Sequence, residues 1–367
     1  MVRLPVGAEP LDAHFSPSIG IDSDDNVHVF GGAHVTQPFY MKTEHAGQLN
    51  SLSTIDAPFP PGEDRISYPS CVMSGDGRLF LIYRIGVPAR SSWRLMAWQG
   101  EDKCWSSESR PLVSGMGEGT WAAGPYLNTP IREHGGYFGV FLVWRSEAIS
   151  GSKQRVSNIG VDYFETKLDG PLIRTRDGRA LPTPVTPAVS ERVIAVGWNS
   201  QLSNQSGATR LPDGRPFGTA LWSAPGQFRQ IHVFWPTKAG KWVSRVITHF
   251  KSNELMLGRG TLHLPHSRPV CSSLPNGSVL VMYRSAEAGG RLLGQLLRPP
   301  DFKSHPDEKY ILWDSELGYY EPVIDVARAE ASGIVSAFVQ KCDGAADNYG
   351  GIRPTSAEAF LVDWKFS

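Results

Sequence analysis

The chain has few cysteines and no surplus of charge of either sign. Its 367 residues include four cysteines, none in the CxxC spacing that is typical of zinc ribbons and thioredoxin-type motifs. We expect these cysteines to be buried free thiols, with a single disulfide as the alternative. The 36 basic residues balance the 36 acidic ones, so the charge pattern of a nucleic-acid or membrane-surface binder is missing.

Long hydrophobic runs are also missing. No apolar stretch approaches the roughly 20 residues that span a bilayer, and the start MVRLPVGAEPLDAH has neither the basic nor the apolar region of a signal peptide. We therefore expect no membrane partner and a cytoplasmic protein, or a secreted or periplasmic one if a leader was removed. Helical periodicity and interdomain linkers are not evident, so the sequence predicts a single domain over 1–367.

The composition favours β-structure. The 38 glycines and 28 prolines separate short β-branched or aromatic runs. One pattern recurs: an extended run, a polar turn and an apolar run. Its copies are HFSPSIGIDSDDNVHVFGGAH (14–34), YPSCVMSGDGRLFLIYR (68–84), LNTPIREHGGYFGVFLVWR (127–145), NQSGATRLPDGRPFGTALW (204–222), RPVCSSLPNGSVLVMYR (268–284) and, more faintly, EPVIDVARAEASGIVSAFVQ (321–340).

The clear copies predict β-hairpins with turns at Asp24, Asp76, Gly135, Asp213 and Asn276. Their spacing of roughly 50 to 80 residues suits the four-stranded blades of a propeller. Six hairpins and a degenerate copy near 160–200 predict an all-β propeller of seven four-stranded antiparallel blades. We expect the C-terminal EAFLVDWKF (358–366) to join the N-terminal blade and close the ring. A two-sheet sandwich is the alternative fold.

The hairpin register makes a sharper prediction. Residues equidistant from a turn face each other across an antiparallel hairpin, and the open ends of all blades meet on one face of a propeller. We therefore expect a cluster of polar side chains there. The facing pairs are His14 with His34, Tyr68 with Arg84, Asn204 with Trp222, and Arg268 with Arg284, while Arg145 ends its hairpin as Arg84 does.

Some of the other polar residues have a simpler interpretation. A single arginine at a strand end is usually solvated or salt-bridged, and the lone His28 and His232 alternate within strands and suit packing. His263 and His266 form an HxxH, but on an extended segment this spacing does not bring both rings together, so a metal site is not favoured. Coincidence explains the paired residues less well, and we interpret them as a functional site.

Arginines beside neutral acid–base groups suit an anionic substrate that loses a proton. In β-elimination from a uronic acid, arginine neutralises the carboxylate and the charge that develops on it. A histidine or tyrosine removes the C5 proton, and a facing group protonates the departing O4. We expect adjacent arginine to lower the pKa of Tyr68 and so make it a better base.

Other propeller functions fit the sequence less well. A glycoside hydrolase normally needs a pair of carboxylates, and the predicted open ends carry no repeated Asp or Glu. A sialidase needs a Tyr–Glu pair and usually has Asp-box repeats. A WD-type binding propeller would have GH and WD dipeptides in each blade, and this sequence does not repeat them from blade to blade.

Four stretches carry a resemblance to a known family: HFSPSIGIDSDDNVHVFGGAH, SYPSCVMSGDGRLFLIYR, GVFLVWR and a weaker NQSGATRLPDGRP. They resemble the BNR-repeat-like, seven-bladed polysaccharide lyases. That family includes ulvan lyases and rhamnose–glucuronate lyases. The resemblance implies β-elimination at the O4 of a uronic acid, with glucuronate linked to rhamnose as substrate. It implies no cofactor for the chemistry, but a structural Ca²⁺ or Zn²⁺ with unassigned ligands. We expect a monomer whose partner is an acidic polysaccharide or oligosaccharide.

The resemblance also implies roles for individual residues. His34 would be the principal base and acid with His14 beside it, and Tyr68 would share in proton transfer. Arg84 and Arg145 would hold the uronate carboxylate. Further substrate contacts are expected from Arg284, Asn204 and Arg268.

Two other functions stay open. The first is an α-L-rhamnosidase on the same scaffold, which releases saturated sugars. The second is a non-catalytic carbohydrate-binding propeller that uses Trp93, Trp121 and Trp198 for stacking on sugars.

Overall fold

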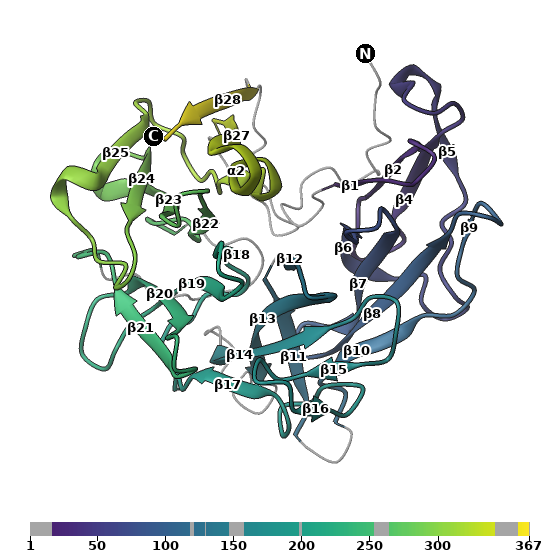
Figure 1. Cartoon of the computed structure of the whole chain (residues 1–367), viewed down its shortest axis with the longest axis horizontal. Coiled ribbons are helices and arrows are strands. Elements are labelled where there is room, and N and C mark those ends of the chain that lie inside the picture. The colour runs from purple at the N-terminus through teal and green to yellow at the C-terminus, as the bar shows by residue number, and fades with distance from the viewer. Residues whose placement is uncertain are drawn as a thin grey trace.

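The structure is a computed structural model that describes residues 17–117, 121–128, 130–146, 158–197, 200–252, 264–341 and 359–366. The described strands pair antiparallel within six sheets. Figure 1 shows these sheets following one another in chain order around a common centre. The prediction of an all-β propeller is confirmed.

The first two sheets contain the strands from β1 to β10. The first sheet has the order β1-β2-β4-β5, and the second has the order β10-β8-β7-β6-β3, with β9 paired to β8. Their strands are β1 (Ser18–Ile21), β2 (Val27–Gly31), β3 (His34–Thr36), β4 (Phe39–Thr43), β5 (Leu52–Ile55), β6 (Ile66–Met73), β7 (Leu79–Val87), β8 (Arg90–Gln99), β9 (Cys104–Trp105) and β10 (Arg110–Ser114).

The third sheet is the largest, with β11-β13-β14-β15-β16 in order, β12 on β13 and β17 on β14. Its strands are β11 (Ala123–Leu127), β12 (Ile131–His134), β13 (Tyr137–Ser146), β14 (Asn158–Thr166), β15 (Ile173–Arg174), β16 (Ala180–Leu181) and β17 (Glu191–Ile194).

The last three sheets follow chain order from edge to edge. The fourth has β18 (Ala208–Arg210), β19 (Pro216–Trp222), β20 (Gln230–Pro236) and β21 (Trp242–Val246), and the fifth has β22 (Val270–Ser273), β23 (Val279–Ser285), β24 (Arg291–Leu297) and β25 (Lys309–Trp313). The sixth has β26 (Val323–Ile324), β27 (Ile334–Gln340) and β28 (Ala359–Lys365).

The prediction of seven blades is wrong. Among the described residues five sheets have four or more strands, and the sixth sheet has three. The stretch near 160–200, expected to form a degenerate blade, belongs to the third sheet because β14 pairs with both β13 and β17. That stretch therefore enlarges one blade and does not add another.

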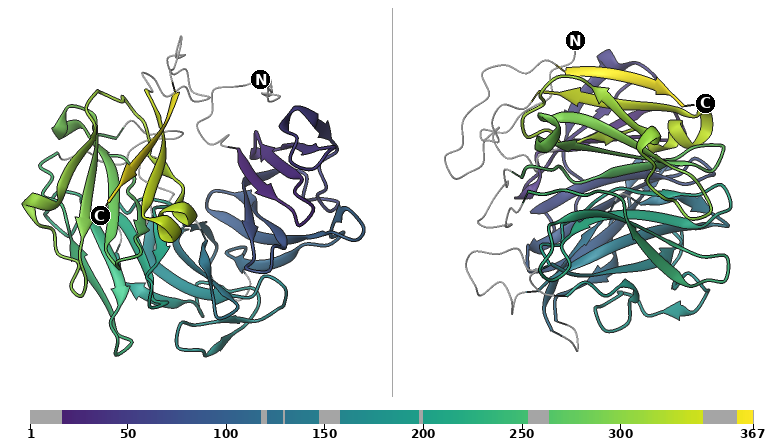
Figure 2. Two further views of the ribbon diagram at one scale, coloured as in Figure 1. Left: turned by 45° about the horizontal axis from the view of Figure 1, so that its top comes forward. Right: turned by 90° about the vertical axis from the view of Figure 1, so that its left-hand side faces the viewer.

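The predicted pairing of the C-terminal strand with the N-terminal blade is not found among the described residues. Strand β28 pairs with β27 along its whole length, from Ile334 opposite Lys365 to Gln340 opposite Ala359. Val362, Trp364 and Phe366 pack against the core between the fifth and sixth sheets. Val362 and Trp364 of β28 are thus half-buried against that core, whereas Phe360 and Leu361 are exposed. Figure 2 shows the first and last described sheets on either side of an opening in the ring.

The hairpin register is confirmed close to four of the five predicted turns, whereas at the third His134 faces Tyr137, one residue off the predicted centre at Gly135. Ser18 faces Phe30, Cys71 faces Leu81, Ala208 faces Gly218 and Val270 faces Met282, each pair equidistant from its predicted turn residue. At two of these turns glycine follows the polar residue with φ of 84°, at Gly77 and Gly277. Only glycine adopts this left-handed conformation without a steric penalty, which explains the recurring Asp-Gly and Asn-Gly.

The hydrophobic core is divided among the sheet interfaces. Each of its five clusters joins two consecutive sheets of the described chain, as where Phe30 of the first sheet meets Leu81 of the second. Full burial of one such side chain stabilises the fold by roughly 1.5–3 kcal/mol. The sheets are therefore held together face to face in chain order.

A helix replaces the turn expected in the last repeat. The sequence showed no helical periodicity, yet α2 (Val326–Ser332) connects β26 to β27. Asp325 caps its first turn by accepting from the Arg328 amide, and Gly333 ends it with φ of 70°. Seven residues are too few for a clear periodic pattern. Among the described residues the other helices are single 3₁₀ turns: η1 (Leu49–Ser51), η2 (Ala286–Ala288) and η3 (Pro306–Glu308).

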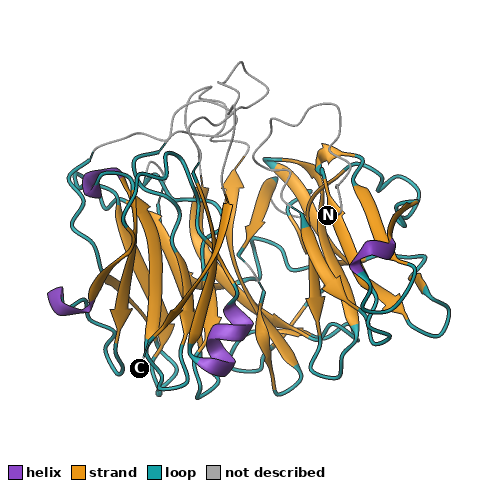
Figure 3. Cartoon of the chain, turned by 90° about the horizontal axis from the view of Figure 1, so that it is seen from above, coloured by secondary structure: helices purple, strands orange, loops and turns teal. Residues whose placement is uncertain are grey.

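Helix α2 is joined to the inner strands by a buried carboxylate. The side chain of Glu330 accepts hydrogen bonds from the Thr209 hydroxyl at 2.7 Å and the Arg210 amide at 3.1 Å, and it forms an ion pair with Arg132 at 2.9 Å. Thr209 and Arg210 belong to β18, and Arg132 belongs to β12. Glu330 therefore ties the third, fourth and sixth sheets together at the end of the strands where the hairpins turn, the end at which Figure 3 shows α2.

Two buried histidines make the fold sensitive to acid. The ring of His232 stacks on Trp222 at 3.4 Å between centroids, and that of His266 stacks on Phe250 at 3.5 Å. Burial lowers the pKa of each to about 4. The unfolded chain therefore binds more protons than the native one below the ordinary histidine pKa of about 6.5.

We predict that the free energy of unfolding is constant above about pH 6.5 and falls by a few kcal/mol as the pH drops toward 4. Urea unfolding at a series of pH values measures it. His232→Phe keeps the stacking and should remove part of the acid-dependent loss, since His266 and His28, whose pKa values burial also lowers, remain. Equal stability at about pH 7 and pH 5 would contradict the prediction.

Candidate functional site

The predicted site residues meet at the end of the strands opposite the hairpin turns. His34 lies in β3, which pairs with β6 so that His34 faces Ser67. The ring of His34 is 5.9 Å from that of Tyr68, and the Arg84 guanidinium lies 4.6 Å from the same Tyr68 ring. The structure thus brings these three predicted residues together.

A bulge alters the predicted facing of Tyr68 and Arg84. The register of β6 on β7 shifts between Ser67 and Ser70, and Arg84 faces Ser67. Tyr68 itself has φ of 54°, a left-handed conformation that is rare for an aromatic residue. The prediction of a directly facing pair is therefore wrong by one residue, but the bulge turns the Tyr68 ring over the guanidinium.

Arg84 is completely buried beneath two tyrosines. Its side chain has no exposed surface, and its guanidinium lies 4.6 Å from the ring of Tyr68 and 5.1 Å from that of Tyr126. Nη2 donates to the Ser67 hydroxyl at 3.2 Å, whereas Nε and Nη1 have no hydrogen-bond partner. Arg84 thus lies beneath the rings of Tyr68 and Tyr126, and its contact with a uronate carboxylate stays a prediction.

Arg145 is partly exposed and is held by neutral groups. It donates to the Tyr126 hydroxyl at 2.8 Å, to Asn158 Oδ1 at 3.1 Å and to Asn204 Oδ1 at 2.6 Å. Asn158 also donates to Asn204 Oδ1 at 2.7 Å. Because its partners carry no charge, Arg145 keeps its positive charge for a ligand.

Asn204 is therefore in the site, although not by the predicted pairing. The fourth hairpin is paired only from Ala208 to Arg210 on its first strand, so Asn204 lies beyond the ladder. Trp222, its predicted partner, stacks on His232 instead. Asn204 thus reaches Arg145 of the third sheet.

Sequence reasoning missed three members of the cluster. They are Tyr126, Asn158 and Glu321. Tyr126 lies one residue before the third repeat, and shifting the boundary of that repeat would have included it. Asn158 opens a strand outside any repeat, and Glu321 opens the faintest one, so neither carried a signal.

Arg268 is paired with a carboxylate. Its Nε lies 3.0 Å and 2.8 Å from the two carboxylate oxygens of Glu321, and its Nη2 also donates to that group. The predicted partner Arg284 does not face it, since the Ser267 amide donates to the Arg284 carbonyl at 3.0 Å. The guanidinium of Arg284 binds the backbone carbonyls of Tyr320, Pro265 and Leu264. Arg284 therefore braces the two segments that carry Arg268 and Glu321.

The electrostatics of Tyr68 differ from the expectation. Burial raises its pKa to about 12, and this effect outweighs the lowering by Arg84, Arg145 and Arg268. Tyr68 is therefore protonated at neutral pH and is a proton donor rather than a base. Burial also opposes the charges of Arg268 and Glu321, but their attraction raises the pKa of Arg268 and lowers that of Glu321.

Several predicted residues stay untested or lie elsewhere. His14, His263 and Trp198 fall outside the described residues, so the His14–His34 pair remains a prediction. Trp93 is buried and donates to the Pro125 carbonyl at 2.8 Å, whereas Trp121 is exposed.

A metal site is not formed by the residues that the structure describes. No group of three or more His, Cys, Asp or Glu side chains among them could hold an ion. The structural Ca²⁺ or Zn²⁺ remains a prediction. Within the same residues, no helix is long and apolar enough to cross a membrane.

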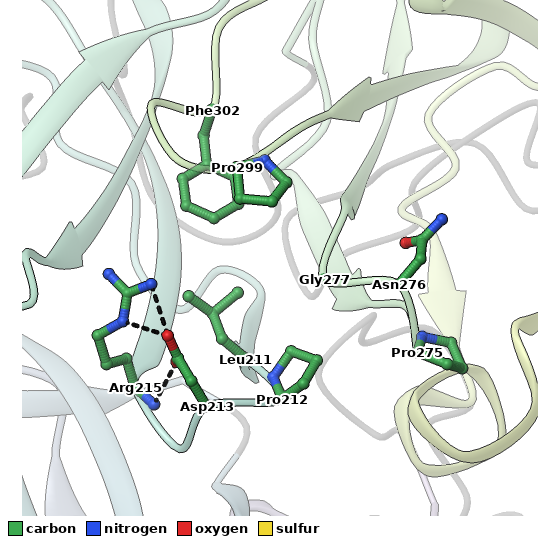
Figure 4. Close-up of a pocket in the computed structure, with 9 residues that line it drawn as sticks. All are labelled: Leu211, Pro212, Asp213, Arg215, Pro275, Asn276, Gly277, Pro299 and Phe302. Atoms are coloured by element: carbon green, nitrogen blue, oxygen red, sulfur yellow. Dashed lines mark hydrogen bonds and ion pairs between the residues drawn. The ribbon is translucent and has the colours of Figure 1, made fainter.

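A separate hollow lies at the turn end of the strands. It is lined by residues of the fourth and fifth hairpin turns, among them Asp213, Arg215, Asn276 and Gly277, together with Phe302 (Figure 4). Arg215 and Asp213 form an ion pair at 2.7 Å within it. The hollow is therefore distinct from the polar cluster at the open ends.

Comparisons with known proteins agree with this architecture. The family model described as BNR repeat-containing family member matches residues 1–250. Among solved structures, a family PL25 ulvan lyase has a TM-score of 0.71 at 12% identity, covering 98% of this chain and 81% of that chain. The same type of enzyme bound to -[GlcA(1-4)Rha3S]- has a TM-score of 0.68 at 11% identity, with the same coverage.

The polysaccharide lyase Uly1 is also similar, with a TM-score of 0.62 at 14% identity, covering 91% of this chain and 75% of that chain. The TM-scores establish a shared fold. No curated protein matches the sequence.

Tyr126→Phe tests whether the Tyr126 hydroxyl holds the Arg145 guanidinium in place. The substitution removes the hydroxyl that accepts from Arg145 Nη1 and keeps the buried ring. We expect a loss of about 1–2 kcal/mol in the free energy of unfolding, measured by chemical denaturation. Tyr137→Phe is the control, because the Tyr137 ring packs on Arg174, and should change stability by less than about 0.5 kcal/mol. Equal effects of the two substitutions would contradict the assigned role.

Proposed function

This chain belongs to the family of BNR repeat-containing proteins, and we propose that it is a polysaccharide lyase that cleaves at the O4 of a uronic acid by β-elimination. The observation that carries the proposal is the cluster of His34, Tyr68, Arg84, Tyr126 and Arg145 at the open ends of the strands. The likeness of the fold to solved polysaccharide lyases supports it.

The charges in the cluster suit a uronate. Arg145 is exposed enough to contact the carboxylate, and its three neutral partners fix the orientation of its guanidinium. Arg84 adds a second positive charge beneath Tyr68 and Tyr126. Both charges stabilise the negative charge that spreads into the carboxylate when C5 loses its proton.

Two neighbouring groups divide the proton transfers. We assign His34 as the base that takes the C5 proton. The electron pair of the C5–H bond forms the C4–C5 double bond, and the C4–O4 bond breaks with its electrons on O4. Tyr68, which its raised pKa keeps protonated, donates the proton that O4 takes up.

A carboxylate-pair hydrolase has less support. Among the described residues of this cluster, the carboxylate of Glu321 is bound to one arginine, Arg268, which engages both of its oxygens. A retaining or inverting mechanism needs two carboxylates at set distances across the bond. β-Elimination needs only a base, an acid and neutralising cations, which His34, Tyr68 and Arg145 supply.

For the substrate we propose a polymer in which glucuronate is linked to rhamnose. The ulvan lyase that shares the fold was solved with a repeat of this type. We further propose that the chain acts as a monomer without nucleic-acid or membrane partners.

The direct test is the appearance of the C4–C5 double bond in ultraviolet absorbance during incubation with ulvan, gum arabic and other glucuronate polymers. A rise with any of them supports the lyase. Free rhamnose without a double bond would favour the α-L-rhamnosidase, and binding without products would favour the carbohydrate-binding propeller.

His34→Ala should abolish double-bond formation, because general base catalysis contributes about 10²–10⁴-fold. Since His34 is partly exposed, the free energy of unfolding should change by less than about 1 kcal/mol. His45→Ala, at an exposed position of the first sheet, is the control and should retain full activity. A His34→Ala protein with normal turnover would remove His34 from the mechanism.

The role of Tyr68 as a proton donor predicts its titration. The protonated form is lost only as the pH rises toward about 12, so Tyr68 should not ionise below about pH 10. The tyrosinate absorbance of the wild type minus that of Tyr68→Phe measures this directly. Ionisation of one additional tyrosine in the wild type at about pH 9 or below would show that Tyr68 acts as a base instead.

A further inference from the structure

We propose that the Arg268–Glu321 pair selects substrates by charge, so that the site accepts uronate chains without sulfate and disfavours sulfated ones. This inference rests on the proposed function, because it specifies the substrate class of the same site. The residue that determines the specificity is Glu321.

Arg268 lies close enough to the cluster to act on the same ligand. Its Nη1 lies 3.2 Å from Oε1 of Gln205, and the preceding residue Asn204 accepts from Arg145 at 2.6 Å. The side chains of Arg268 and Glu321 are 36% and 40% exposed. A sugar that places its carboxylate at Arg145 would therefore bring its neighbour within reach of this pair.

The donors of Arg268 are already engaged. Nε and Nη2 bind the Glu321 carboxylate, and Nη1 lies 3.2 Å from Gln205 Oε1. A sulfate group that bound Arg268 would have to displace Glu321. The displaced carboxylate would stay close to the sulfate, and like charges at that distance repel. An uncharged sugar meets no such penalty.

The pair is also fixed in place by a buried residue. Arg284 is 4% exposed and donates to the carbonyls of Leu264 and Pro265 on one side and of Tyr320 on the other. These segments lead directly to Arg268 and Glu321. Exposed ion pairs are usually mobile and weak, whereas bracing by Arg284 holds this carboxylate against the arginine.

The partners of Arg145 and Arg268 also favour a substrate with one negative charge. Arg145 has neutral partners and can match one negative charge of the ligand. Arg268 is matched by Glu321 within the protein. The uronate carboxylate therefore finds an available cation, and a second anionic group on the adjacent sugar does not.

The experiment compares ulvan with chemically desulfated ulvan as substrates for the full chain. The wild type should have the higher kcat/KM on the desulfated polymer. Glu321→Gln keeps the shape of the side chain and removes its charge, so the ratio of kcat/KM on sulfated to desulfated polymer should rise about tenfold. The rise should disappear in Glu321→Gln combined with Arg268→Gln, because the gain depends on the released arginine.

Glu308→Gln is the matched control. Glu308 forms a similar ion pair with Arg298 at 2.7 Å, in the connection between β24 and β25. This substitution should leave the substrate ratio unchanged. An unchanged ratio in Glu321→Gln, with cleavage intact, would overturn the inference while the lyase stands.

Binding separates the two proposals. Calorimetric titration of the His34→Ala protein, with and without Glu321→Gln, against short oligosaccharides of the two polymers measures selection without turnover. A tenfold shift in relative affinity, together with no double-bond formation by the wild-type chain on either polymer, supports charge selection and overturns the lyase. Failure to bind either oligosaccharide overturns both.

Discussion

The buried carboxylate of Glu330 joins three sheets of a ring whose first and last described sheets do not pair. It accepts from the Thr209 hydroxyl and the Arg210 amide, and its ion pair with Arg132 reaches the third sheet. A buried carboxylate is costly unless its hydrogen bonds are satisfied, so these partners lock α2 against the inner strands. At the opposite ends the sheets converge through contacts of their own, such as Arg145 with Asn204 and Arg268 with Gln205.

The candidate site depends on that convergence. Its residues come from five sheets and are separated by up to almost three hundred positions in the chain, from His34 to Glu321. The local contacts are then built in layers. Arg84 lies at the base, Tyr68 and Tyr126 cover it, and Arg145 is held beside Tyr126. The left-handed backbone of Tyr68 is the strained point that places its ring there.

Burial sets the chemistry of this cluster more than charge does. Three arginines favour tyrosinate at Tyr68, yet desolvation raises its pKa to about 12. The tyrosine therefore suits the donor role in β-elimination and leaves the base role to His34. Similarly, Arg268 differs from Arg145 through its partner: a carboxylate neutralises Arg268, whereas amides and a hydroxyl hold Arg145. This contrast is what allows the site to distinguish one negative charge from two.

The sequence by itself determined the all-β propeller class, the hairpin turns and the register beside them, because a turn and the two-residue period of a strand are local properties. It also identified His34, Tyr68, Arg84, Arg145 and Asn204 as members of one cluster. Only the tertiary structure decided the number of sheets, since the stretch near 160–200 pairs with β13 and β14 instead of standing alone. It also decided the bulge at Tyr68, the burial of Arg84 and the partners Tyr126, Asn158 and Glu321. These features arise from contacts between sheets, and no local pattern encodes which side chains distant strands bring together.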